Sequence, residues 1–130
     1  MLIQIFRAVA ESGGCPPECR DWLQTRNLDS LGGLIPPLVD LVQTALGAGA
    51  FARLPDQGPT VTEQGLLGAV AISMRDPEEC QRMLGSILPP KAAQQAEDWV
   101  RAIDFVLRDQ YAEGVQSAQF ETVQRGVTIH

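Results

Sequence analysis

Apolar residues recur at helical spacing along most of the chain, and proline and glycine punctuate the pattern. Between Leu38 and Leu46, for example, apolar side chains occur at intervals of three and four residues, which places them on one face of a helix. Read in this way, the sequence predicts an all-α fold, a compact bundle of about five or six helices. The helices begin near Leu2, Pro16-Pro17, Pro36-Pro37, Thr60, Asp76-Pro77 and Pro90, and the last extends to about Tyr111.

Residues at the predicted helix starts give this interpretation a physical basis. Proline is tolerated in a first helical turn because its missing N–H has no partner there, and Asp76 before Pro77 is a typical N-cap. Thr60 and Glu63 have the spacing of a capping box, in which each side chain accepts a hydrogen bond from the other residue's backbone N–H. The helix that follows is apolar on all sides, which predicts that it is buried, and its glycines would admit a close neighbour.

The two ends of the chain are less regular than the middle. The run from Leu2 to Phe6 fits a helix or a short strand, because it is brief and partly β-branched. β-branched residues between Phe120 and Ile129 predict an extended or short β-like tail over 115–130. We therefore expect one helical domain over residues 1–130, with a linker at about 50–59 and this tail at its end.

Two ungapped stretches of the sequence, residues 5–23 and 66–84, resemble each other. They share identical residues at a constant offset of 61, among them Glu18-Cys19 and Glu79-Cys80. An internal duplication would give two related three-helix halves, residues 1–49 and 60–114. Coincidence in an alanine-rich helical chain is the alternative, and the sequence leaves both open.

One short segment resembles part of a known family. Residues 32–42, with the sequence GGLIPPLVDLV, resemble the start of the last helix of an armadillo-type repeat. The offset of 61 between the two similar stretches exceeds the period of about 40 to 47 residues in such repeats. We draw no function from the resemblance.

The charge balance is acidic, with ten basic and sixteen acidic residues and a net charge of −6. Such a balance disfavours nucleic acid and anionic membrane surfaces as partners, because both are bound through Lys and Arg. No segment reaches the length of about 20 apolar residues that a membrane span needs, and the N-terminus carries no signal-peptide pattern. Three cysteines, an odd number, favour a reducing compartment, and we expect the cytoplasm. The preference for Arg, Ala, Gly and Pro suggests a bacterial or viral source.

Residues that carry catalytic chemistry are few. The chain has one histidine, His130, at its terminus, and this argues against a Ser–His or Cys–His mechanism. Cys15, Cys19 and Cys80 would need His130 to complete a zinc site of three thiolates and one imidazole. The alternative, which we favour, is that the cysteines pack as small apolar side chains. We assign no catalytic residue, no metal and no cofactor.

Aromatic residues at unusual positions point instead to contacts with protein. Phe105 departs from the apolar stripe of the last helix, and Trp99 lies at the edge of that stripe. The alternative is that the last helix is central and buried on two sides. Ile5 and Phe6 are further candidates for docking on a partner, with packing on the chain's own core as the alternative. We expect a non-enzymatic interaction protein, an adaptor, regulator or assembly factor that binds a protein partner or itself as a homo-oligomer. A thiol- or metal-dependent protein and an accessory subunit of a larger enzyme are the alternatives.

Overall fold

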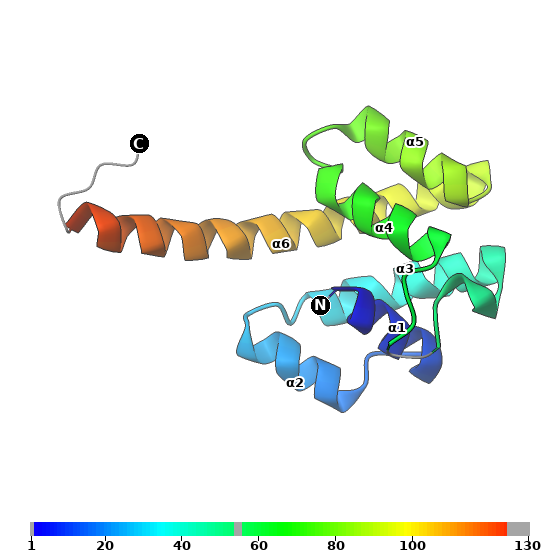
Figure 1. The fold of residues 1–130 in the computed structure, drawn as a ribbon, viewed down its shortest axis with the longest axis horizontal. Coiled ribbons are helices and arrows are strands. Elements are labelled where there is room, and N and C mark those ends of the chain that lie inside the picture. The colour runs from blue at the N-terminus through cyan, green and yellow to red at the C-terminus, as the bar shows by residue number, and fades with distance from the viewer. Residues whose placement is uncertain (1, 54–55, 125–130) are drawn as a thin grey trace.

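The structure is a computed structural model that describes residues 2–53 and 56–124, with side chains described for 2–47, 49–53 and 56–109. Over these residues it is all-helical, with six α-helices, one short 3-10 helix and no strand, which confirms the predicted fold class. The elements are α1 (Leu2–Ser12), α2 (Pro17–Thr25), α3 (Leu31–Leu46), η1 (Ala48–Ala50), α4 (Val61–Ile72), α5 (Pro77–Ile87) and α6 (Pro90–Gln124) (Figure 1).

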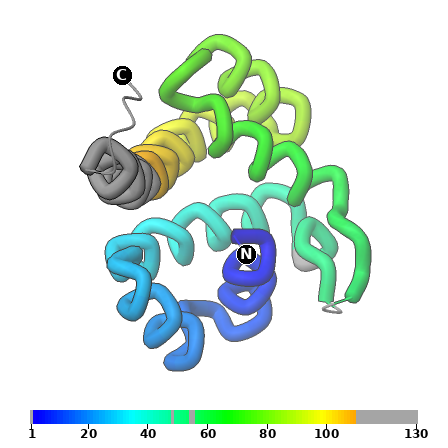
Figure 2. The backbone as a smooth tube through the Cα atoms, turned by 60° about the vertical axis from the view of Figure 1, so that its left-hand side comes forward, coloured from blue at the N-terminus to red at the C-terminus, as the bar shows by residue number. Residues whose placement is uncertain are grey.

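Helix α3 lies at the centre of the bundle. It packs against α1 on one side and against α6 on the other, and α2 lies at its N-terminal end (Figure 1). Helices α4 and α5 form a closely packed pair that contacts α6 (Figure 2). Helices α1–α3 therefore meet helices α4–α6 mainly through the contact between α3 and α6.

One hydrophobic core runs through the whole bundle. Its fully buried aliphatic side chains come from α2, α3, α4, α5 and α6, and include Leu23, Leu38, Leu66, Leu84 and Ile103. The ring of Phe6 in α1 meets the ring of Phe51 edge to face, with 6.2 Å between their centroids. Because all these residues belong to one cluster, the chain folds around a single core rather than two.

Most helix boundaries agree with the residues that predict them. Thr60 and Glu63 form the capping box at the start of α4, and the Asp76 side chain accepts a hydrogen bond from the backbone N–H of Glu79 at the start of α5. Glycines Gly13 and Gly47 follow α1 and α3 with φ angles of 74° and 91°, in the left-handed region that glycine enters without steric cost.

The start of α3 differs from the prediction. The helix begins at Leu31, so Pro36 and Pro37 lie inside it rather than opening it. The backbone N–H groups of Leu31, Gly32 and Gly33 donate to carbonyls three residues earlier, which starts the helix ahead of the prolines. The carbonyls that the two proline rings crowd belong to Gly32 and Gly33, where the backbone adapts most easily.

The two ends of the chain and the predicted linker can be compared with the structure in the same way. Residues Leu2–Ser12 are helical, so the short N-terminal strand is wrong. Helix α6 continues to Gln124, so the extended tail predicted from residue 115 is wrong as far as Gln124, and residues 125–130 lie outside the described part. Within the linker predicted at 50–59, Ala50, Phe51 and Ala52 are buried, because this segment closes one end of the core.

The two similar stretches occupy matching places in the order of helices. Val9 in α1 and Val70 in α4 are both buried, as are Leu23 in α2 and Leu84 in α5. The helix pairs differ in packing, however, because α4 and α5 contact each other closely whereas α1 and α2 do not. The two stretches thus share burial at matching positions but not the packing of their helices.

Helices α4 and α5 approach each other closely at two glycines of α4. A Cβ atom placed on Gly65 would lie 2.9 Å from Cγ2 of Ile87, and one on Gly68 would lie 2.5 Å from Cε of Met83. Both distances are shorter than an ordinary van der Waals contact of about 3.5 Å. The glycines therefore admit the close neighbour that the sequence predicts.

Candidate functional site

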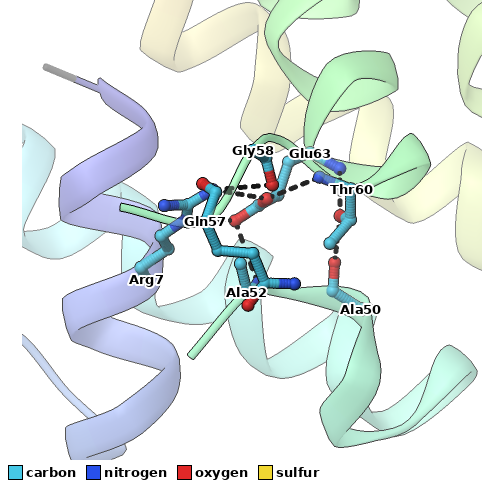
Figure 3. Close-up of polar contacts among 7 residues, drawn as sticks. All are labelled: Arg7, Ala50, Ala52, Gln57, Gly58, Thr60 and Glu63. Carbon is cyan, nitrogen blue, oxygen red and sulfur yellow. Dashed lines mark hydrogen bonds and ion pairs between the residues drawn. The ribbon is translucent and has the colours of Figure 1, made fainter. Parts of the chain in front are cut away.

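The buried carboxylate of Glu63 is the centre of a polar cluster that joins three segments of the chain (Figure 3). Nε and Nη2 of Arg7 donate to its two oxygens at 2.7 and 3.1 Å. The backbone N–H groups of Thr60 and Ala52 donate to the same oxygens at 2.8 and 3.2 Å. Arg7 also donates to the carbonyl of Gln57 at 3.0 Å, so one ion pair joins α1, the 50–60 segment and α4.

Burial of the Glu63 carboxylate is the largest single influence on its pKa and acts to raise it. The hydrogen bonds from Arg7, Thr60 and Ala52, together with the Arg7 charge, act in the opposite direction and outweigh it. The pKa of Glu63 therefore lies below its ordinary value, and the carboxylate is ionised at neutral pH. A fully buried group with four donors already in place holds the fold together and offers no open face to a substrate.

A second buried polar cluster joins α4 to α6. The Asp104 carboxylate accepts hydrogen bonds from Oγ of Ser73 at 2.8 Å, from the backbone N–H of Met74 at 3.1 Å and from Nε of Arg108 at 2.9 Å. Nη2 of Arg108 donates to the carbonyl of Ala71 at 3.1 Å. These contacts satisfy polar groups at the C-terminal end of α4, and Ser73 is too deeply buried to reach a substrate.

Of the three cysteines, Cys15 and Cys19 are partly buried and Cys80 is buried. Cys80 is buried in the core, and burial raises the pKa of its thiol. Cys19 is half-buried, and its thiol pKa is raised first by burial and then by Cys15 and Glu18. A raised pKa keeps these two thiols protonated, which makes them poor nucleophiles and poor metal ligands. Among the described residues no three Cys, His, Asp or Glu side chains group as a metal site, and His130 lies outside them.

Ile5 and Phe6, two of the predicted interaction residues, are not at the surface. Phe6 is fully buried and Ile5 nearly so, because both lie on the face of α1 that packs into the core. Docking of these side chains on a partner is therefore wrong for the folded chain, and the stated alternative, core packing, is what the structure has.

An open groove of about 680 Å³ lies between α3 and α6. Its α3 wall includes Leu34, Pro37 and Leu41, and its α6 wall includes Trp99 and Ala102. These side chains are partly buried, so they are anchored in the fold and still present apolar surface to the groove. Its volume falls within the range of about 300–1,000 Å³ that is common for ligand clefts.

Phe105 extends this apolar surface along α6. It lies one turn after Ala102, on the neighbouring part of the helix surface, and its side chain is 59% exposed. Among the residues whose side chains the structure describes, up to residue 109, it is the only aromatic one that is exposed. Of the two alternatives for Phe105, an exposed side chain or one buried on a second face of the last helix, the structure has the exposed one, and Trp99 lies in the groove.

The charged side chains that line the groove are both acidic. Asp40 comes from α3, of which it is the only charged residue, and Asp98 comes from α6. The nearby arginines of α6 do not offset them, because Arg101 is paired with Glu97 and Arg108 with Asp104. The groove thus combines an apolar lining with negative charge from both walls.

A smaller cavity of about 380 Å³ lies between α1 and α2. It is lined by Gln4, Ile5, Glu18, Cys19 and Trp22. The Arg26 guanidinium lies over the Trp22 ring, 3.8 Å from its centroid, and covers part of the indole. Each of the chain's two tryptophans therefore lies in a different cavity, Trp22 here and Trp99 in the groove between α3 and α6.

Comparison of the chain with protein-family models, with curated proteins and with solved structures found no match. No helix within residues 2–53 and 56–124 combines the length and apolar character that crossing a membrane requires.

Proposed function

We propose that this protein is a non-enzymatic interaction module that binds a protein partner in the groove between α3 and α6. The observation that carries the proposal is the open apolar groove with Trp99 in its wall and the exposed Phe105 beside it. Aromatic side chains in and beside an apolar groove are typical centres of binding energy in protein interfaces.

The distribution of polar groups supports a binding role over a catalytic one. The buried polar side chains Glu63, Ser73 and Asp104 already have hydrogen-bond partners within the fold. The groove itself offers Thr44, Gln95 and two aspartates, a set suited to orienting a ligand. The free thiols of all three cysteines fit a reducing compartment, and we place the module in the cytoplasm.

Photo-cross-linking from two exposed apolar positions tests the proposal. A benzoylphenylalanine is placed at Phe105, beside the groove, or at Val61, which is 77% exposed and lies at the start of α4. We expect ultraviolet irradiation in the native cells to give a discrete protein adduct from position 105 and none from position 61. Trp99→Ala should remove that adduct, because the substitution removes the largest side chain of the groove wall.

Two results would contradict a docking role for the groove. One is the absence of any adduct from position 105. The other is an adduct that forms equally from both positions, because the chemistry of the groove would then play no part in it.

A further inference from the structure

Building on the proposed docking function, we infer that the partner segment in the α3–α6 groove is a cationic amphipathic helix of another protein. This inference rests on the proposed function and adds the shape and the charge of the ligand. Three features of the groove carry it, namely its length, its apolar lining and the sign of the charge on its walls.

Length and shape favour a helix as the ligand. The residues that line the α3 wall run from Leu34 to Thr44, and those of the α6 wall from Gln95 to Ala102. At 1.5 Å per residue these walls extend about 15 and 10 Å, enough for two to three turns of a third helix. A helix laid between two packed helices presents apolar residues at i, i+3 or i+4, and i+7, and i to i+7 also spans about 10 Å.

The apolar lining supplies the pockets that such a stripe of residues needs. Leu34, Pro37 and Leu41 recur along one face of α3, opposite Trp99 and Ala102 on α6. Ala102 is small, so it leaves room beside the Trp99 indole for a ligand side chain. Phe105, one turn further along α6, offers an exposed ring to the end of the ligand helix.

Charge identifies the chemical class of the partner. Asp40 and Asp98 place a carboxylate on each wall, and the arginines closest to them along α6 are held by Glu97 and Asp104. Complementarity calls for Lys or Arg on both flanks of the ligand's apolar stripe. A second copy of this chain is a poor occupant, because it would bring its own acidic groove and a net charge of −6 against these aspartates.

The experiment uses the full chain and three fluorescent synthetic peptides in an anisotropy titration. The first peptide is a helix of about 18 residues with a leucine stripe flanked by Lys and Arg. The second has the same composition in an order that destroys the stripe. The third keeps the stripe and replaces every Lys and Arg by Glu. We expect saturable binding of the first peptide only.

Two charge variants test the role of the walls without removing apolar surface. Asp40→Asn together with Asp98→Asn should weaken binding of the basic peptide about fivefold at low salt, a loss typical of two partly exposed charge contacts. Asp21→Asn together with Asp56→Asn makes the same change of charge at exposed positions outside the groove, and should weaken binding less than about twofold.

A variant at the end of the groove tests its location. Phe105→Ser removes an exposed ring and should weaken binding about tenfold, whereas Val61→Ser, also exposed, should leave binding unchanged. Both substitutions replace side chains outside the core, so retained far-UV circular dichroism and an unchanged melting temperature will show that the fold persists.

The outcomes separate this inference from the proposed function. Binding of the Glu peptide as tightly as the basic peptide, with both lost in Phe105→Ser, would overturn the charge preference and leave docking in the groove intact. Binding insensitive to both the aspartate pair and Phe105 would overturn the inference, and so would no binding of the basic peptide up to about 1 mM. An adduct from position 105 in cells would still support the proposed function in that last case.

Discussion

The buried ion pair between Glu63 and Arg7 makes a sharp prediction about stability. The perturbation is Glu63→Gln, which keeps the size of the side chain and removes its charge. In the native protein two donors meet each carboxylate oxygen, with Arg7 and Thr60 at one and Arg7 and Ala52 at the other. An amide offers only one acceptor oxygen, so in either orientation two of the four donors face an NH₂ group.

The expected magnitude follows from these lost contacts. A buried donor without an acceptor costs about 1–3 kcal/mol, and breaking one side of a buried ion pair costs about 3–5 kcal/mol in total. We therefore expect Glu63→Gln to lower the free energy of unfolding by about 3–5 kcal/mol, against a total of about 5–15 kcal/mol for a domain. For a chain of this size the melting temperature should fall by about 10–20 °C.

Urea and thermal unfolding followed by circular dichroism at neutral pH provide the assay. The matched control is Glu79→Gln on α5, which breaks the exposed ion pair of Glu79 with Arg82 and should shift the melting temperature by no more than about 2 °C. Arg7→Met should also lower the melting temperature. Combined with Glu63→Gln it should add little, because the charge attraction can be removed only once.

One result would refute the reasoning about Glu63. If Glu63→Gln unfolds at the same urea concentration and temperature as Glu79→Gln, the buried pair contributes no more than an exposed one. The hydrogen bonds around Glu63 would then not hold α1, the 50–60 segment and α4 together.

Two further predictions concern pH and helix packing. The lowered pKa of Glu63 stabilises the fold above the ordinary glutamate pKa of 4.5, and this stabilisation is lost as the pH falls through the lower folded-state value. The stability gap between the wild type and Glu63→Gln, measured in urea, should therefore narrow below pH 4.5, and a gap that stays constant to pH 3 would contradict this assignment. Gly65→Ala should lower the free energy of unfolding by about 1 kcal/mol, because the branched Ile87 side chain cannot move away from the new methyl group. Gly68→Ala should leave stability unchanged or raise it, because the flexible end of Met83 can swing aside, and equal melting temperatures for the two variants would count against this distinction.

Local signals in the sequence predicted most of the fold. The capping box of Thr60 and Glu63 and the N-cap of Asp76 depend on residues within one helical turn, so their spacing is enough to find them. One exception is α3, where a pair of prolines inside a helix looks like a helix start; the C-terminal part of α6, predicted as an extended tail, is another. A turn ahead of the prolines, together with the burial of Leu31 and Ile35, places the true start of α3 earlier.

Long-range contacts were not predictable in the same way. Glu63 was identified as half of a capping box, but nothing near it in the sequence indicates that Arg7, 56 residues away, pairs with it. The sequence left it open whether Phe6 packs on the core or faces outward, because an apolar helix face packs inward only where another segment covers it. In the structure the ring of Phe51 covers Phe6.

Part of the groove is predictable from the pattern of one helix, and part depends on how two helices pack. Trp99 and Phe105 were found from the pattern of their own helix. Leu34, Asp40 and Leu41 complete the site from α3, and the packing of α3 on α6 is a property of the tertiary fold. The aromatic half of the site was therefore predictable, and the opposite wall with its charge was not.

The two tryptophans allow one direct test of where a ligand binds. Trp99 lies in the α3–α6 groove and Trp22 in the α1–α2 cavity, so their indole N–H signals in a ¹⁵N–¹H spectrum report on the two sites separately. On titration with the basic amphipathic peptide, we predict that the Trp99 signal moves to saturation while the Trp22 signal stays in place. Movement of the Trp22 signal alone, or of neither signal, would contradict the central claim that the α3–α6 groove is the docking site.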